Sequence, residues 1–334
     1  MKAQIIRSFG GPELFEAAEL PDPVPGPGQV LVRQAASSVN PVDTKLRANG
    51  GPMAPELPAV LGCDVAGIVE ALGPGVTALS PGDAVFGCGG GVRGQGGAYA
   101  ERIAVDARFL ARMPAGLGFA EAAALPLVTI TAWEGLFDRA GVTAGDTVLV
   151  QGGAGGVGHL VIQLAAHRGA RVFATVSGPD KAEIVRRLGA EEAIFYRDEP
   201  VADYVGRLTG GQGFDLVFDA TGGRDLPSSF AAARLYGQVV AIVSRFDADL
   251  ALMQARSLSL HVIFMLLPML HGIGGDSHGR IMAAAARLVE EGHLKPLLDS
   301  RRFPLAQLAD AHRHLESGRA VGKVVVEIDP SIPR

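Results

Sequence analysis

The sequence has very little cysteine and no long hydrophobic run. Two cysteines, Cys63 and Cys88, are too few for a disulfide framework. The longest strongly apolar stretch, Val262 to Leu270, has nine residues and contains Pro268, whereas a membrane-spanning helix needs about 20. The first residues, Met1 to Arg7, lack the apolar core of a secretory signal. We therefore expect a cytoplasmic protein with no membrane partner.

Positive charge is also scarce. The 334 residues include 30 Lys and Arg against 35 Asp and Glu, a net charge of −5, and we find no long basic run. This balance argues against a nucleic-acid partner. Hydrophobic residues make up 48% of the chain, which is ample for burial, and the length predicts two domains.

The first third of the chain is typical of short strands separated by turns. Apolar, β-branched runs alternate with Gly/Pro segments, and they predict a compact β-rich module. The predicted strands are Gln29 to Ala35, Val65 to Ala71, Ala84 to Phe86 and Ala98 to Val105.

The middle of the chain alternates strands with helices. Thr147 to Gln151 is a continuous β-branched run of the kind that a parallel sheet buries on both faces. Repeated alternation of this kind predicts an α/β, doubly wound parallel sheet. Further strands are expected at Arg171–Val176, Ala193–Tyr196, Phe214–Ala220, Gln238–Val243 and His261–Leu266, with helices at Val157–His167 and Lys181–Leu188. The tail predicts helices at Ile281–Glu291 and Leu305–Glu316 and a closing strand, Lys323–Ile328.

A glycine-rich turn between the strand at 147–151 and the following helix is the strongest functional motif. It consists of Gly153, Ala154, Gly155, Gly156, Val157 and Gly158. Glycines permit the tight turn and let backbone amides approach a pyrophosphate, and the helix N-terminus favours its negative charge. The alternative is a turn needed only for helix–sheet packing. The order of strand, turn, helix and strand favours dinucleotide binding.

Cofactor choice is expected at the end of the second strand of this sheet. A site for NAD normally places Asp or Glu there, whereas this strand ends in Ser177. Ser177 could donate to a 2′-phosphate and Lys181 could neutralise it, which favours NADP(H). Alternatively, Ser177 and Asp180 cap a helix and Lys181 is solvated, or Asp180 accepts from the ribose.

Several motifs together resemble a known family. They occur in the same order as in zeta-crystallin-type quinone oxidoreductases of the medium-chain dehydrogenase/reductase superfamily, and the resemblance covers nearly the whole chain. The motifs are Asn40 to Thr44, Leu61 to Val69, Gly152 to Gly158 with Gln163 to Ala165, Phe214 to Gly222, and Gly322 to Val326.

The resemblance implies a GroES-like, β-rich catalytic domain and an inserted Rossmann domain. The expected boundaries are 1–125 with 267–334 for the catalytic domain and 126–266 for the NADP(H)-binding domain. A homodimer would pair the sixth Rossmann strands, around His261 to Leu266. Walls of a substrate pocket are expected from Lys45 to Pro55, Cys88 to Gly97 and Phe264 to Leu270. Phe264, Met265 and Leu267 favour a small hydrophobic carbonyl or quinone if they face this pocket, and packing in the dimer interface would explain them equally well.

The resemblance also implies the absence of a metal. Zinc-dependent relatives carry Cys, His and Cys where this chain has Asn40, Cys63 and Leu127, and a catalytic zinc needs three protein ligands. A zinc enzyme with atypical ligands would have to use Cys63 and Asp64.

By resemblance, four side chains would lie near the cofactor. Asn40 and Thr131 would contact the nicotinamide and ribose, Tyr196 the adenosine end and Lys323 the pyrophosphate. Their plain alternatives are turn chemistry for Asn40, a helix cap for Thr131, core packing for Tyr196 and a solvated strand end for Lys323. Lys45 stands where some quinone reductases carry a tyrosine, so no general acid can be named.

The leading hypothesis is therefore a zinc-independent oxidoreductase that reduces quinones or α,β-unsaturated carbonyl compounds with NADPH. Three alternatives remain: an enoyl-thioester reductase on the same scaffold, a non-catalytic NADPH-binding sensor or structural module, and a zinc-dependent alcohol dehydrogenase with atypical ligands.

Overall fold

A computed structural model describes residues 1–223, 226–243 and 249–332. The remaining residues of the predicted domain ranges 126–266 and 267–334 lie outside the described residues. The chain forms two compact units. The first comprises Met1–Ile130, Leu266–Gly292 and Pro296–Arg334, and the second comprises Thr131–Met265 and His293–Lys295. The family resemblance implied boundaries at 125/126 and 266/267. No helix among the described residues is both long and apolar enough to cross a membrane.

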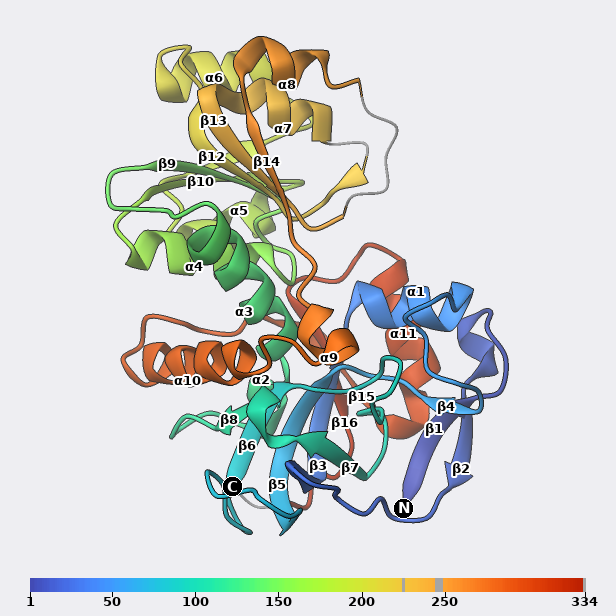
Figure 1. Cartoon of the computed structure of the whole chain (residues 1–334). Helices are drawn as coiled ribbons and strands as arrows, with labels where there is room; N and C mark the ends of the chain where they lie inside the picture. The colour runs from blue at the N-terminus through green and yellow to red at the C-terminus, as the bar shows by residue number, and fades with distance from the viewer. Residues whose placement is uncertain (224–225, 244–248, 333–334) are drawn as a thin grey trace. The chain divides into compact units, whose positions relative to one another are not determined.

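The first unit is built on two β-sheets (Figure 1). The larger sheet has the order β15-β16-β3-β5-β6-β8, with β7 also paired to β3, and the smaller has the order β2-β1-β4. The strands are β1 (Lys2–Ile6), β2 (Glu16–Glu19), β3 (Gln29–Val39), β4 (Ala59–Val60), β5 (Asp64–Leu72), β6 (Ala84–Cys88), β7 (Arg102–Asp106), β8 (Leu110–Arg112), β15 (Leu298–Pro304) and β16 (Lys323–Glu327). The helices are α1 (Pro41–Asn49), α2 (Phe119–Ala123), α9 (Leu267–His271), α10 (Asp276–Glu290) and α11 (Leu308–Glu316).

The C-terminal segment completes the first unit. Strand β16 pairs antiparallel with β3, and Val324 faces Val39. Val39 of β3 and Val324 and Val326 of β16 enter a core that also contains Ile6, Phe303 and Leu308. The sheet is therefore assembled from both ends of the chain.

The second unit is a six-stranded parallel sheet in the order β11-β10-β9-β12-β13-β14. This is the order of a doubly wound dinucleotide-binding fold. The strands are β9 (Thr147–Gln151), β10 (Arg171–Val176), β11 (Glu192–Phe195), β12 (Phe214–Asp219), β13 (Ala233–Ala241) and β14 (Ser259–Val262). The helical segments are α4 (Gly158–His167), α5 (Pro179–Arg187), α6 (Val201–Thr209), α7 (Leu226–Ala232), α8 (Ala251–Arg256), a π-helix (Glu134–Arg139), and α3 (Pro126–Trp133), which begins in the first unit.

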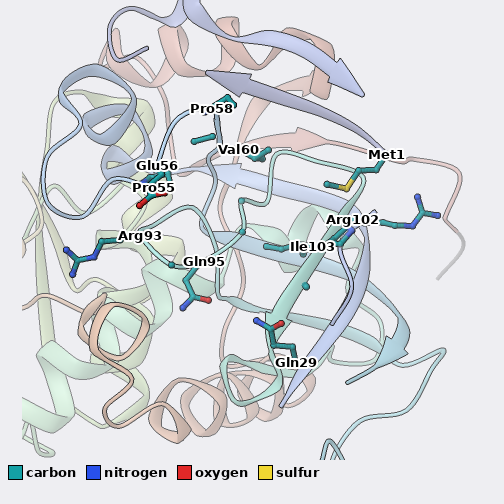
Figure 2. Close-up of a pocket in the computed structure, with 16 residues that line it drawn as sticks. Met1, Gln29, Pro55, Glu56, Pro58, Val60, Arg93, Gln95, Arg102 and Ile103 are labelled. Atoms are coloured by element: carbon teal, nitrogen blue, oxygen red, sulfur yellow. The ribbon is translucent and has the colours of Figure 1, made fainter. Parts of the chain in front are cut away.

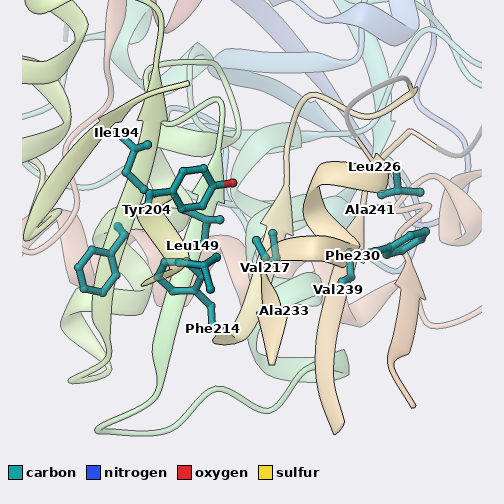
Figure 3. Packing of buried hydrophobic residues seen from close by; sticks show 13 residues of the cluster. Leu149, Ile194, Tyr204, Phe214, Val217, Leu226, Phe230, Ala233, Val239 and Ala241 are labelled. Atoms are coloured by element: carbon teal, nitrogen blue, oxygen red, sulfur yellow. The ribbon is translucent and has the colours of Figure 1, made fainter. Parts of the chain in front are cut away.

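One face of this parallel sheet packs against α6, α7 and α8. Figure 3 shows Leu149, Phe214 and Val217 from the sheet with Tyr204 and Phe230 from the helices. All five side chains are at most 2% exposed. Near-continuous apolar strands are expected where both faces of a sheet are covered, and the predicted α/β fold class is confirmed.

Four strand predictions are wrong by four or more residues at one end. Strand β3 runs on to Val39 and does not end at Ala35, and β13 begins at Ala233 and not at Gln238. The other two are β7 and β14. Ala98 and Tyr99 donate backbone hydrogen bonds to Gly62 and Leu61 outside the main ladder, so β7 begins only at Arg102. The sixth strand of the parallel sheet ends at Val262 and not at Leu266, because its neighbour β13 ends at Ala241, opposite Val262. Beyond that pair, β13 has no further residue with which β14 could pair.

Replacing Phe230 with Ala tests the core of the second unit. Phe230 is 1% exposed, so we expect a loss of about 3–5 kcal/mol in the free energy of unfolding from lost burial and a residual cavity. Urea unfolding measures it. Leu235→Ala is the control, because Leu235 is 59% exposed and should change stability by less than about 0.5 kcal/mol. Equal effects of the two substitutions would contradict this packing.

Candidate functional site

The glycine-rich turn joins β9 to α4 at the carboxyl edge of the parallel sheet. Gly152 has φ +74°, and its N–H donates to Thr175 Oγ1 at 3.0 Å. The Thr175 hydroxyl in turn donates to Gln151 Oε1 at 2.8 Å. These bonds hold the turn against the neighbouring strand β10.

Close backbone approach explains the glycines in this turn. A Cβ on Gly158 would lie 2.3 Å from the carbonyl oxygen of Gly152, and one on Gly153 would lie 2.7 Å from Cβ of Ala174. His159 N donates to Gly155 O at 3.2 Å, which opens the helical pattern of α4. The first N–H groups of a helix have no partner within it, so this end suits an anion such as a pyrophosphate. The turn therefore fits a dinucleotide.

Other predicted cofactor residues follow the adjacent strands. Ser177 comes directly after β10, Lys181 lies in the first turn of α5, and Tyr196 comes directly after β11. Because β9, β10 and β11 are parallel neighbours, these positions share one edge of the sheet with the glycine turn. Ser177 and Lys181 are partly buried. Tyr196 is 50% exposed and not part of the core.

The first unit contains a buried polar cluster at Asp64, which begins β5. Asp64 Oδ2 accepts hydrogen bonds from Ser38 Oγ at 2.5 Å and from Asn40 Nδ2 at 2.8 Å. Its other oxygen, Oδ1, accepts from the backbone N–H of Leu127 at 2.8 Å. Asn40 and Asp64 are 0% exposed. The segments around positions 40, 63–64 and 127 therefore meet in space.

Lys323 supplies the positive charge of this cluster. Its ammonium donates to Asn40 Oδ1 and lies 3.4 Å from Asp64 Oδ2. The side chain is 3% exposed, so Lys323 is not a solvated strand end. The structure thus brings together Asn40 and Lys323, which the resemblance had assigned to different parts of a cofactor, the nicotinamide and the pyrophosphate.

Asp43 lies in the first turn of α1, three residues after Asn40. Its carboxylate accepts from Asn40 N at 2.8 Å, from Tyr99 Oη at 3.1 Å and from Cys63 Sγ at 3.3 Å. Burial raises the pKa of Asp43 to about 6, opposed by the Asn40 N–H and reinforced by the charge of Asp64. Asp43 and Tyr99 escaped the sequence analysis, although Asp43 lies within the motif that begins at Asn40.

Thr131 lies in α3 and is 5% exposed. Three residues later, Glu134 begins the π-helix, a form that is frequent at functional sites. Burial raises the pKa of Glu134 to about 7, with a further contribution from the charge of Asp138. Glu134 can therefore hold a proton near neutral pH. The sequence analysis missed it; the only indication in the sequence is a carboxyl group placed between the apolar residues 132–133 and 136–137.

A cavity of about 680 Å³ opens on the first unit (Figure 2). Its size is in the range of ligand pockets. Pro55 and the loop Arg93 to Gly97 line it, as do Val60 and Ile103. The same loop reaches α9, where Gln95 Nε2 donates to Met269 O at 3.2 Å. Parts of two segments expected as pocket walls thus line this cavity, and Met269 of the third contacts the loop.

No group of three or more His, Cys, Asp or Glu side chains that could hold a metal occurs in the part of the chain that the structure describes. His312 and His314, two residues apart on α11, turn to different partners. His312 contacts Arg47 Nη1, and His314 Nε2 lies 3.0 Å from Asp299.

Comparison with known proteins identifies the family. Residues 26–115 match the model of the alcohol dehydrogenase GroES-like domain, and residues 188–326 match that of the zinc-binding dehydrogenases. The chain is 36% identical to the NADPH-dependent alkenal/one oxidoreductase of Arabidopsis thaliana, a chloroplastic protein, over 98% of this chain and 79% of that protein. This chain belongs to the medium-chain dehydrogenase/reductase superfamily of oxidoreductases. The resemblance to its quinone oxidoreductases is confirmed.

Solved structures agree with this assignment. An alcohol dehydrogenase superfamily protein from Novosphingobium aromaticivorans is 43% identical, with a TM-score of 0.93 over 98% of this chain and 99% of that one. The quinone oxidoreductase of Escherichia coli, solved in complex with NADPH, is 26% identical, with a TM-score of 0.88 over 98% and 100%. The chain also matches phthioceranic/hydroxyphthioceranic acid synthase of Mycobacterium tuberculosis at 34% identity over 97% of this chain, but it spans only 15% of that protein.

Substituting Ala for Gly158 tests the packing of the glycine turn. The new Cβ would meet a backbone oxygen at 2.3 Å, so the turn must shift, and we expect a loss of about 1–3 kcal/mol in stability. Gly206→Ala is the matched control, because a Cβ there meets nothing within 4 Å inside helix α6. It should leave stability unchanged or raise it by up to about 1 kcal/mol. Thermal and urea unfolding of both variants decide between these expectations.

Asp43→Asn tests the raised pKa of Asp43. A carboxyl that binds its proton more tightly when folded contributes stability below the unfolded pKa of 3.8 and loses it as the pH rises through about 6. The free energy of unfolding of the parent, minus that of the variant, should therefore fall by about 2 kcal/mol between pH 4.5 and 7. Urea unfolding over this range measures it. A flat profile for Asp43→Asn would refute the assignment.

Proposed function

We propose that this protein is a zinc-independent oxidoreductase that uses NADP(H) to reduce a quinone or an α,β-unsaturated carbonyl compound. The observation that carries the proposal is the glycine turn at the carboxyl edge of the parallel sheet, with Ser177 and Lys181 following the next strand. The nearby relatives named for alkenal/one and quinone reduction, one of them solved with NADPH, support the same chemistry.

The chain's own residues would bind and orient the cofactor. The backbone of Gly153, Ala154, Gly155, Gly156, Val157 and Gly158 would hold the pyrophosphate, Ser177 and Lys181 the 2′-phosphate, and Tyr196 the adenosine end. Asn40 and Thr131 would serve the nicotinamide and ribose. When bound, the cofactor supplies the hydride, and the protein positions it and excludes water.

The Asp64 cluster supports zinc independence. Asp64 already accepts from Ser38, Asn40, Leu127 and Lys323, and a carboxylate offers about four acceptor positions. The thiol of Cys63 is protonated, because its contact with Cys88 and its burial raise its pKa well above the usual value. A metal would have to displace the Lys323 ammonium and a thiol proton together. In this proposal Lys323 orients the Asn40 side chain by donating a hydrogen bond to its Oδ1. The expected contact of Lys323 with a pyrophosphate stays a prediction.

A second candidate is an enoyl-thioester reductase on the same scaffold. The 34% identity to a segment of phthioceranic/hydroxyphthioceranic acid synthase supports it. We also propose a homodimer through β14. This strand is at the edge of the sheet; its last residue, Val262, is 48% exposed, and Phe264, two residues further on, is 39% exposed.

Turnover of NADPH and NADH tests the function. Protein purified without chelator and analysed for metal should oxidise NADPH with 1,4-benzoquinone, a naphthoquinone or a simple enone. Preference for an enoyl thioester would favour the second candidate. Cofactor binding without turnover across the panel would indicate a sensor or structural module. Binding of neither cofactor would refute the proposal, and zinc-dependent turnover of alcohols would indicate the atypical zinc enzyme.

Lys181→Ala tests the choice of cofactor. Loss of one charge-assisted bond to a phosphate is worth about 1.5 kcal/mol, so KM for NADPH should rise about tenfold while KM for NADH stays unchanged. Arg187→Ala removes an exposed charge from the far end of the same helix and should change neither value. Equal shifts for the two cofactors in Lys181→Ala would remove Lys181 from the 2′-phosphate site.

A further inference from the structure

Two imidazole rings meet on the surface of the second unit. His167 ends α4, and His293 begins the segment His293–Lys295 that belongs to this unit. Their ring centroids lie 4.5 Å apart, with the ring planes at 45°. Both side chains are exposed, so solvent and dissolved ions reach them.

The segment that carries His293 is clamped to α4 by Gln163. Gln163 Nε2 donates to Lys295 O at 2.9 Å, and Lys295 N donates to Gln163 Oε1 at 2.8 Å. Gln163 is 7% exposed and stands four residues before His167, so the two side chains share one face of the helix. The clamp keeps His293 beside His167 and reduces the ordering that a shared ligand would require.

The local field also suits a cation. The carboxyl end of a helix carries partial negative charge, and His167 is the last residue of α4. Two basic residues are close in the chain: Lys295, two residues after His293, and Arg168, whose guanidinium lies over the Phe137 ring at 5.4 Å. Imidazole is a preferred ligand of Zn²⁺, Cu²⁺ and Ni²⁺.

We propose that His167 and His293 form a binding site for a divalent transition-metal ion, of which Ni²⁺ is the probe. The exposed rings would rotate so that each directs one nitrogen at the ion, and water would fill the other coordination positions. Within the described residues no third His, Cys, Asp or Glu completes a set, so the ion would exchange freely. Because the chain on both sides of His293–Lys295 belongs to the first unit, the ion would fasten this returning segment to α4.

Calorimetric titration of metal-stripped, tag-free protein with Ni²⁺ at pH 7.5 tests the site. We expect one binding event in the micromolar range and a rise in Tm that Mg²⁺ does not produce. His167→Ala and His293→Ala should each weaken binding by about tenfold or more. His271→Ala is the matched control, an exposed histidine at the end of α9 in the first unit, and it should bind as the parent does.

Hydrogen exchange and a second variant separate a built site from two unrelated histidines. Ni²⁺ should slow exchange of the amides at 293–295 in the parent protein. Gln163→Ala keeps both imidazoles but removes the clamp, so it should bind Ni²⁺ several-fold more weakly and lose that protection. Unchanged affinity in His167→Ala or His293→Ala, or no Ni²⁺ binding by the parent, would overturn the proposal.

Discussion

The buried ion pair between Lys323 and Asp64 joins the last strand of the chain to the segments that surround Asn40. Lys323 begins β16, Asp64 begins β5, and β3 lies between these two strands. A buried charge is tolerated only with a full set of partners, and removing one partner of such a pair costs about 3–5 kcal/mol. Here Ser38, Asn40 and the Leu127 N–H complete the set. The orientation of the Asn40 carboxamide therefore depends on a residue 283 positions away.

The same cluster shows how one buried site separates the roles of two carboxyl groups. Asp64 faces an ammonium, whereas Asp43 faces a phenol and a thiol and has its pKa raised to about 6 by burial. Asp43 also closes the first turn of α1 by accepting from Asn40 N. The start of α1, the ion pair and the Asn40 side chain consequently form one hydrogen-bonded unit.

Local patterns predicted the parallel sheet well. The strands Thr147–Gln151 and Arg171–Val176 have the bounds expected of them, because each is a continuous apolar run with turn residues at its ends. The stretch Ala98 to Val105 is also rich in apolar residues, but its first residues bond to Leu61 and Gly62 in a loop. Composition does not reveal which backbone partner such a run will find, so the start of β7 was not predictable.

The glycine turn and the buried polar cluster around Asp64 differ in how far the sequence predicts them. The glycine turn is a local motif, and its place between β9 and α4 follows from adjacent residues. Lys323 and Tyr99 gain their partners only through long-range pairing, and no spacing in the chain announces those contacts. The raised pKa of Glu134 likewise follows from burial in the folded unit, since no sequence pattern states how much water a carboxyl will keep.

The return of β16 to β3 also bears on the order in which the protein can form during synthesis. Residues 131–265 are one continuous segment with their own core, and they leave the ribosome before β16 exists. The larger sheet of the first unit must wait for that last strand, with the edge of β3 open and Asp64 lacking its ammonium partner. Open strand edges invite wrong pairing. The N-terminal portion of the first unit therefore remains open to misassembly until β16 has been made.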